Sequence, residues 1–174
     1  VERLCYGERK HPTDGSLIPS SEFGTAVHHR IEELIQAQLH GHEIGESPYQ
    51  EWAAPFLEWV QACNVKPIAT ECVVADKLIK IAGSVDFIGY DSEGKLFLAD
   101  YKCRTNTKGK AKVFEAFIVQ RQHNLEYTPE CRSVVIDCDT KKHWHHVWSA
   151  KEVKQGIANT KLMTKLYWNK RMKK

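Results

Sequence analysis

Two short segments of the chain combine residue types that could perform chemistry. The first is Gly83-Ser84-Val85-Asp86 and the second is Asp100-Tyr101-Lys102. Asp100 and Lys102 are two residues apart, so on a β-strand their side chains project from the same face. Two carboxylates beside one ammonium could bind a divalent cation and stabilise developing negative charge. That chemistry suits the hydrolysis of a phosphodiester bond.

A β-hairpin would bring the two segments together. Apolar and polar residues alternate over 77–90, and residues 95–103 read as a second strand. Between them, Asp91-Ser92-Glu93-Gly94 is a turn signal. We therefore expect adjacent strands whose functional ends lie within reach of each other.

The composition is that of an ordinary globular protein. At 174 residues, with 42% hydrophobic and 27% charged residues, the chain is most simply a single domain spanning 1–174. The net charge of +3 permits nucleic acid as a partner without arguing for it. No apolar run is long enough to span a membrane, and the first residues lack a signal-peptide pattern. We expect an intracellular protein without a membrane partner.

The cysteine pattern indicates reduced thiols. The six cysteines, at positions 5, 63, 72, 103, 131 and 138, form no C-x-x-C pair and no zinc-ligand spacing. Several lie within apolar patterns, where a reduced cysteine acts as a small hydrophobic residue. We predict no iron–sulfur cluster.

Periodicity and breakers predict an α/β sandwich around a mixed sheet. The last predicted helix runs into a basic C-terminal tail, residues 165–174. The predicted order is an irregular segment 1–20, helices from Ser20 or Ser21 to Gly41 and over 48–63, strands over 68–75, 77–90 and 95–103, a helix over 113–127, strands over 131–138 and 143–149, and a helix over 150–169.

The two segments resemble the core of the PD-(D/E)xK nuclease superfamily. The motif Gly24-Thr25-Ala26-Val27-His28-x-x-Ile31-Glu32 is similar to the histidine motif of the RecB-type branch, which includes the mitochondrial genome maintenance exonuclease. Glu71 matches a position where this branch often carries glutamate. The resemblance implies a restriction-endonuclease-like αβββαβ core, with a mixed central sheet flanked by helices.

The resemblance also implies a metal site. Its ligands would be His28, Asp86, Asp100 and the backbone carbonyl of Tyr101, holding one or two Mg²⁺ or Mn²⁺ ions. Lys102 would hold the attacking water or neutralise charge on the phosphate oxygens. Asp86, Asp100 and Lys102 could instead be an incidental ion pair on a solvent-facing hairpin, and His28 could simply bond to Glu32 on its own helix.

Two further residues complete the expected catalytic set. Glu71 is more easily explained as a structural or supporting residue than as a direct ligand. Gln120 fits the glutamine of the Q-x-x-x-Y motif that follows the DxK strand in the family. However, Asn124 stands where tyrosine is expected, and Gln122 with Tyr127 is an off-register alternative.

The expected activity is that of a metal-dependent DNA exonuclease acting on single-stranded ends, in replication, recombination or repair. The chain would act as a monomer. The alternatives are an endonuclease of the same superfamily, of resolvase or restriction type, and a DNA-binding module that keeps the fold without the chemistry. A basic loop would contact the phosphate backbone, although such a loop is usually just solvated. The expected nucleic-acid-binding residues are Arg104, Lys108, Lys110, Lys112 and Arg121.

Overall fold

A five-stranded mixed sheet forms the centre of the computed structural model, which describes residues 7–78, 80–104, 113–123 and 125–171. Its strands follow one another in chain order across the sheet. The β5 and β6 strands pair in parallel, whereas every other neighbouring pair is antiparallel. The strands are β3 (Lys66–Asp76), β4 (Ile81–Tyr90), β5 (Leu96–Arg104), β6 (Glu130–Asp137) and β7 (His143–Val147).

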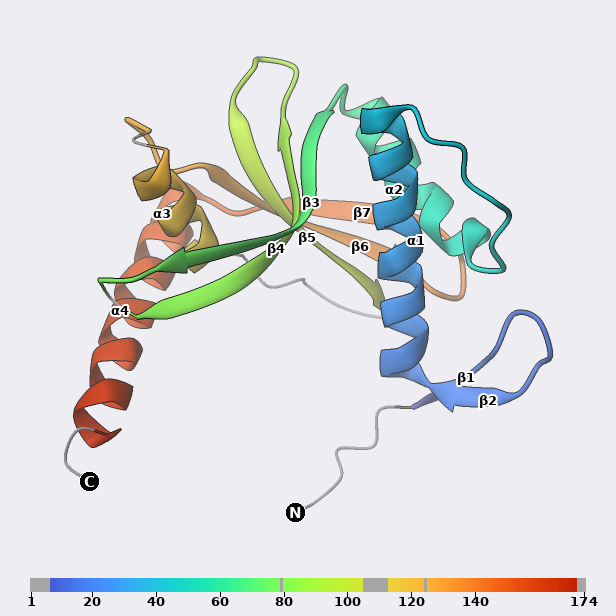
Figure 1. Ribbon diagram of the computed structural model, residues 1–174, viewed down its shortest axis with the longest axis horizontal. Coiled ribbons are helices and arrows are strands. Elements are labelled where there is room, and N and C mark those ends of the chain that lie inside the picture. Colours follow the sequence, from blue (N-terminus) through green and yellow to red (C-terminus); the bar gives the residue numbers. More distant parts are fainter. Residues whose placement is uncertain (1–6, 79, 105–112, 124, 172–174) are drawn as a thin grey trace.

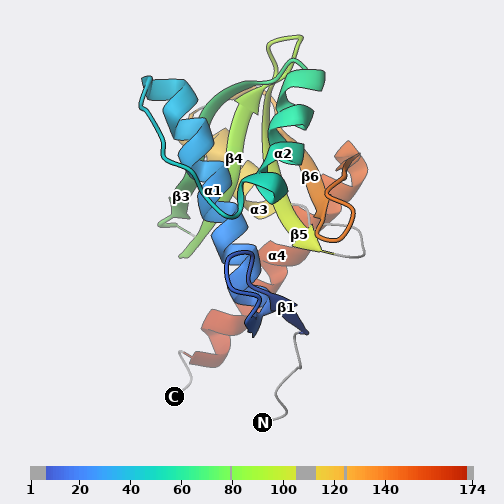
Figure 2. The ribbon, with the colours of Figure 1, turned by 90° about the vertical axis from the view of Figure 1, so that its right-hand side faces the viewer.

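Helices cover both faces of this sheet (Figures 1 and 2). On one face, α1 (Ser20–His40) and α2 (Gln50–Ala62) enclose a hydrophobic cluster centred on Trp59. On the other face, α3 (Val113–Gln122) and α4 (Ala150–Arg171) enclose a second cluster. The predicted α/β sandwich around a mixed sheet is confirmed.

The helix that carries the histidine motif follows its predicted bounds closely. Phe23, Val27, Ile31 and Ile35 recur every four residues and are all buried, so they form the apolar face of α1. The helix ends at Gly41, whose φ of 71° places it in the left-handed region and whose N–H bonds to the carbonyl of Ala37.

The prediction that residues 1–20 are irregular is wrong for two short stretches. β1 (Glu8–Lys10) and β2 (Leu17–Pro19) form an antiparallel hairpin ahead of α1. Two features stabilise it: Ile18 packs against the α1/α2 cluster, and Arg9 bonds to the carboxylate of Asp139 in the β6–β7 turn at 3.0 Å. These long-range contacts have no local sequence signal. Residues 1–6 lie outside the described part of the chain.

The two later helices differ from prediction at their ends. α3 stops at Gln122 rather than near 127, because the chain turns there and the hydroxyl of Thr128 bonds back to the Gln120 side chain at 2.7 Å. α4 remains helical through Arg171, so most of the predicted basic tail is helix. None of the helices in the described ranges is long and apolar enough to cross a membrane.

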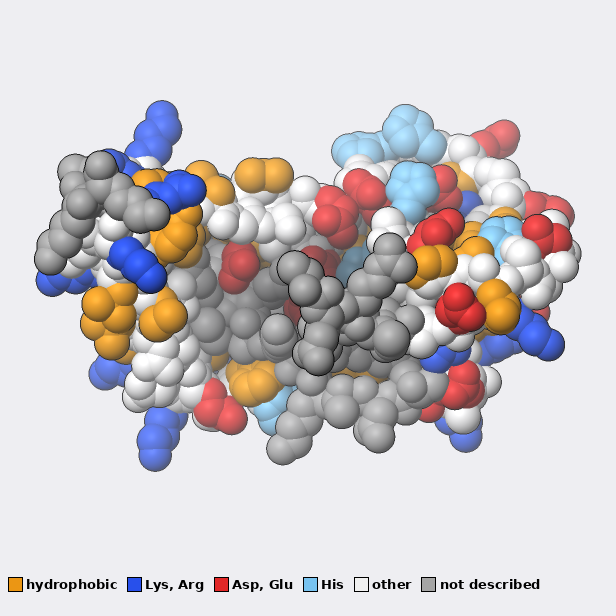
Figure 3. Space-filling model, turned by 90° about the horizontal axis from the view of Figure 1, so that it is seen from below, with side chains coloured by type: hydrophobic (Ala, Val, Ile, Leu, Met, Phe, Trp, Pro, Cys, Tyr) orange, Lys and Arg blue, Asp and Glu red, His pale blue; other side chains and the backbone are white. Residues whose placement is uncertain are grey.

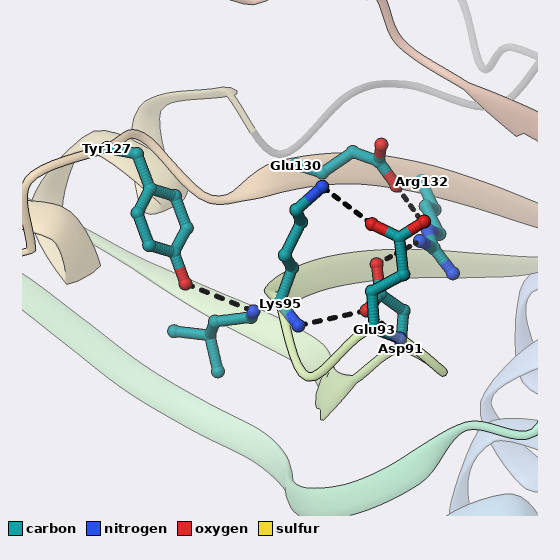
Figure 4. Close-up of polar contacts among 7 residues, drawn as sticks. Asp91, Glu93, Lys95, Tyr127, Glu130 and Arg132 are labelled. Carbon is teal, nitrogen blue, oxygen red and sulfur yellow. Dashed lines mark hydrogen bonds and ion pairs between the residues drawn. The ribbon is translucent and has the colours of Figure 1, made fainter.

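The β4–β5 turn is held by a polar network at the outer end of the hairpin (Figure 4). The carboxylate of Asp91 accepts hydrogen bonds from the backbone N–H groups of Glu93 and Lys95, both at 2.9 Å. Arg132 on β6 reaches the other oxygen of Asp91 at 3.4 Å. Beside it, the N–H of Leu96 donates to the Tyr127 hydroxyl at 3.2 Å. This network confirms the predicted turn and holds the register of the strands that lead to the candidate site.

Candidate active site

Asp86 and Asp100 lie on either side of the Lys102 ammonium group. The Nζ atom of Lys102 is 3.2 Å from Oδ2 of Asp86 on β4 and 2.9 Å from Oδ1 of Asp100 on β5. The two aspartates are 5% and 2% exposed. The fold therefore brings together, in a nearly buried position, the three residues that the sequence singled out first.

These residues lie where the two strands of the hairpin separate. The paired stretch of β4 and β5 runs from Tyr90 and Leu96 to Phe87 and Ala99, and the two aspartates follow it directly. There the N–H of Tyr101 donates to the Asp86 carboxylate at 3.3 Å. Beyond this point, the two strands diverge to opposite sides of the molecule (Figure 1). The Asp86 carboxylate thus accepts a backbone hydrogen bond at the fork where the two strands separate.

A distortion in β3 lies beside this fork. Glu71 has a φ of 49°, which is strained for a residue with a side chain. Thr70, just before it, accepts a hydrogen bond from Gln36 on α1 at 2.9 Å. Strand alternation should place Cys72 on the same face as Thr70, yet Cys72 packs against the α3/α4 cluster. The side-chain pattern of β3 therefore changes face at Glu71.

The neighbouring strand changes face at the same level. Phe87 belongs to the α1/α2 cluster, whereas Val85, two residues away, belongs to the α3/α4 cluster. These residues pair with Thr70 and Cys72, so Asp86 lies at the level of Glu71. The strain at Glu71 coincides with the bend that turns Asp86 toward Lys102. Strained backbone of this kind is common at functional sites.

His28 lies on α1 close to Tyr101 and Glu71. The rings of His28 and Tyr101 are 4.3 Å apart, and Nδ1 of His28 is 4.0 Å from Oε1 of Glu71. The Tyr101 hydroxyl donates to the same Glu71 oxygen at 3.4 Å. Burial raises the pKa of the Tyr101 phenol, so this group stays protonated and acts as a donor. Tyr101 thereby links Glu71, through its hydroxyl, to Asp86, through its N–H.

The electrostatics of the carboxylate pair suit a hard cation. Burial raises the pKa of Asp100; the Lys102 ammonium opposes that shift, and the nearby Asp86 carboxylate adds to it. When ionised, the two carboxylates place two negative charges next to the Lys102 ammonium. Carboxylate oxygens are the ligands preferred by Mg²⁺ and are also suitable for Mn²⁺. Asp86 and Asp100 could therefore contribute carboxylate oxygens to such an ion.

Within the described residues, no three His, Cys, Asp or Glu side chains stand close enough together to hold one metal ion. The candidate residues form two smaller clusters that lie next to each other. Asp86 and Asp100 bond to Lys102, whereas His28 lies against Tyr101 and Glu71. The complete ligand set therefore remains a prediction.

Gln120 forms its hydrogen bonds within the connection that follows α3. Its side chain accepts from Thr128 at 2.7 Å and donates weakly to the carbonyl of Leu125 at 3.5 Å. Tyr127, from the alternative motif, bonds to the β5 backbone at Leu96. Neither hydrogen-bonding pattern joins the Lys102 cluster, and the role of Gln120 stays a prediction.

The predicted nucleic-acid contacts are not described by the structure. Arg104 ends β5 and Arg121 lies in α3, but their side chains are outside the described part. The lysines of the predicted basic loop, Lys108, Lys110 and Lys112, also lie outside it.

Glu115 on α3 is a carboxylate that sequence reasoning missed. A Cβ atom placed on Gly83 would lie 2.7 Å from Oε1 of Glu115, so this side chain packs directly against the backbone of the Gly-x-x-Asp segment. The available signal was weak: a single acidic residue in the first turn of the helix after the basic loop. A glycine at position 83 permits this approach.

No protein-family model matches the chain, and no curated protein matches its sequence.

Proposed function

We propose that this protein is a metal-dependent deoxyribonuclease that hydrolyses phosphodiester bonds, acting on single-stranded ends. The observation that carries the proposal is the position of Lys102, whose ammonium lies between the buried carboxylates of Asp86 and Asp100. Hard oxygen donors next to a fixed positive charge are suited to the hydrolysis of a phosphate diester.

The order of elements supports the same reading. A helix, three antiparallel strands, a second helix and a strand parallel to the third follow the αβββαβ order of the restriction-endonuclease-like core. α2 is then an insertion after the first helix. The histidine of α1 lies within contact of the DxK strand, as the RecB-type resemblance requires.

The chain's own residues would divide the work. Asp86 and Asp100 would hold Mg²⁺ or Mn²⁺ through carboxylate oxygens, with His28 and the Tyr101 carbonyl as further ligands by resemblance. The bound ion would supply Lewis acidity toward the phosphate and lower the pKa of a water. Lys102 would orient that water or neutralise charge on the phosphate oxygens. Glu71 would position His28 and Tyr101.

The direct test measures loss of label from end-labelled single-stranded DNA in Mg²⁺ or Mn²⁺, with and without a chelator. We expect cleavage that the chelator abolishes. Asp100→Ala and Lys102→Ala should each lower the rate by about 10²-fold or more, since each removes a group that stabilises transition-state charge. DNA binding, followed by fluorescence anisotropy in the chelator, should stay close to wild type.

Lys95→Ala is the matched control, because Lys95 lies on the same hairpin but pairs with the exposed Glu93. Its cleavage rate should be unchanged. Wild-type turnover by Asp100→Ala would place the chemistry elsewhere, and the absence of metal-dependent cleavage would favour a binding module. Nicking of covalently closed circular DNA would replace the exonuclease with an endonuclease.

A further inference from the structure

Cys103 and Cys138 lie side by side at the ends of the two parallel strands. In the β5–β6 ladder Cys103 is opposite Ile136, and Cys138 follows directly after the end of β6. Both face the α1/α2 cluster: Cys138 is 4% exposed within it, and Cys103 is partly buried against it. Neither cysteine takes part in a disulfide. The fold thus pairs two cysteines that are distant in the sequence.

The surroundings of Cys138 lower the pKa of its thiol. The first cause is the contact between its sulfur and the Cys103 side chain. Arg9, whose guanidinium is fixed by Asp139 at 3.0 Å, lowers the pKa of Cys138 further, although burial, Asp139 and Asp137 oppose this. A positive charge near a cysteine favours the nucleophilic thiolate.

A cavity reaches Cys138, one of the two cysteines. It has a volume of about 410 Å³, and Arg9, Phe23, Trp52, Cys138 and Asp139 are among the residues that line it. The indole N–H of Trp52 donates to the carbonyl of Cys138 at 2.9 Å, which holds the cysteine in place at the cavity wall. A small polar oxidant can therefore approach the sulfur of Cys138 on the side where Arg9 lies.

We propose that Cys103 and Cys138 form a dithiol pair that closes to an intramolecular disulfide in the presence of a hydroperoxide, with Cys138 as the first reacting thiol. The Cys138 thiolate attacks a peroxide oxygen, the O–O bond breaks, and the leaving oxygen takes a proton to give water or an alcohol. The sulfur of Cys103 then attacks the sulfur of this sulfenic acid and gives up its proton. The S–S bond forms, the S–O bond breaks, and the departing hydroxide takes up the proton as water.

The reaction removes two electrons and two protons from the protein and reduces one peroxide, so its balance needs no other reactant. It does not depend on the proposed nuclease activity, because it uses neither the carboxylates nor Lys102. Failure of the disulfide and failure of the nuclease proposal are therefore separate results.

The test uses the full chain, reduced and freed of reductant, treated with hydrogen peroxide and then with an alkylating reagent. Peptide mass spectrometry should find Cys103 linked to Cys138, and dithiothreitol should reverse the link. Cys103→Ser should stop at a sulfenic acid on Cys138 that a dimedone probe traps. Cys138→Ser should form no such link.

Cys131 is the internal control, because it is a single buried thiol whose pKa burial raises to about 12. Cys138 should react at least about tenfold faster than Cys131, as expected for a thiol with the lower pKa. Circular dichroism establishes that each variant is folded. Absence of the Cys103–Cys138 link in folded wild type, or equal oxidation of Cys131 and Cys138, would overturn the proposal.

Discussion

Lys102 is the residue whose surroundings define the candidate site. Its ammonium balances two carboxylates that burial would otherwise disfavour. Removing the partner of a buried charge destabilises the folded protein, whereas removing one of two charges that repel each other can stabilise it. The three residues of this cluster should therefore respond differently to substitution.

At this scale we expect Asp100→Asn to stabilise the folded protein. The raised pKa of Asp100, caused first by burial, means that the folded state binds its proton more tightly than the unfolded chain does. Stability is therefore lost as the pH rises above the unfolded pKa of about 3.9. At pH 7, in a chelator, the variant should gain about 1 kcal/mol, the usual size of one stabilising substitution. Urea unfolding at pH 7 and pH 3.5 should show the gain shrinking in acid.

Asp91→Asn provides the opposite case. Hydrogen bonds from the backbone N–H groups of Lys95 and Glu93 lower the pKa of Asp91, with Arg132 adding to them (Figure 4). The stability that the ionised Asp91 carboxylate contributes is present above its pKa in the unfolded chain. It is lost as the pH falls through its pKa in the folded protein. Asp91→Asn should therefore lower the free energy of unfolding at pH 7. A gain at both positions would mean that generic charge removal, and not the site, explains the result.

At the scale of elements, β3 and β4 determine where the carboxylates point. Both strands change face at Glu71 and Asp86, and Glu71 takes a left-handed backbone conformation there. Without this change, strand alternation would keep Thr70 and Cys72 on one face. The direction in which the carboxylates point therefore depends on this backbone bend in β3 and β4.

Glu71→Gly should be more stable than Glu71→Ala by about 1 kcal/mol, because glycine adopts a positive φ without strain. Both variants should lose the hydrogen bond from Tyr101 and the contact with His28, so both should cleave DNA more slowly than wild type. Chemical denaturation and the cleavage assay measure the two effects.

Lys141 is the matched position, since its φ of 53° lies in a turn away from the site. Lys141→Gly should also exceed Lys141→Ala in stability, but with no loss of cleavage. Equal stability of Glu71→Gly and Glu71→Ala would show that no strain is stored in β3.

At the scale of the whole molecule, the two helical layers contribute unequally. α1 presents a continuous buried face, whereas Val153 is the only buried residue in the described part of α4. The outer half of α4 extends along the left end of the molecule, where hydrophobic and basic side chains are exposed (Figure 3). Leu162, Met163, Leu166 and Tyr167 are each more than half exposed.

Removing residues 162–174 should therefore leave the fold intact. The segment contributes little buried surface, so the thermal midpoint should change by only a few degrees. Trp59→Ala, which empties a fully buried position in the α1/α2 cluster, should instead cost about 3–5 kcal/mol. Thermal circular dichroism compares the two, and loss of cooperative unfolding in the truncated chain would contradict the expectation.

The sequence alone determined most of the elements and the central cluster. Its periodicities are local, and local propensity and turn chemistry decide where strands and helices begin. The spacing of Asp100 and Lys102 and the turn at 91–94 were enough to predict that Asp86, Asp100 and Lys102 meet. The N-terminal hairpin escaped this reasoning because long-range contacts stabilise it.

Only the tertiary structure decided which contacts the other residues of interest make. Alternation cannot foresee the face change at Glu71, because a positive φ is a backbone response to packing on both faces of the sheet. Nor could spacing place Tyr101 between Glu71 and Asp86, or Cys103 beside Cys138. Each of these pairings joins segments that are distant in sequence, and their proximity depends on the order and register of strands in the sheet.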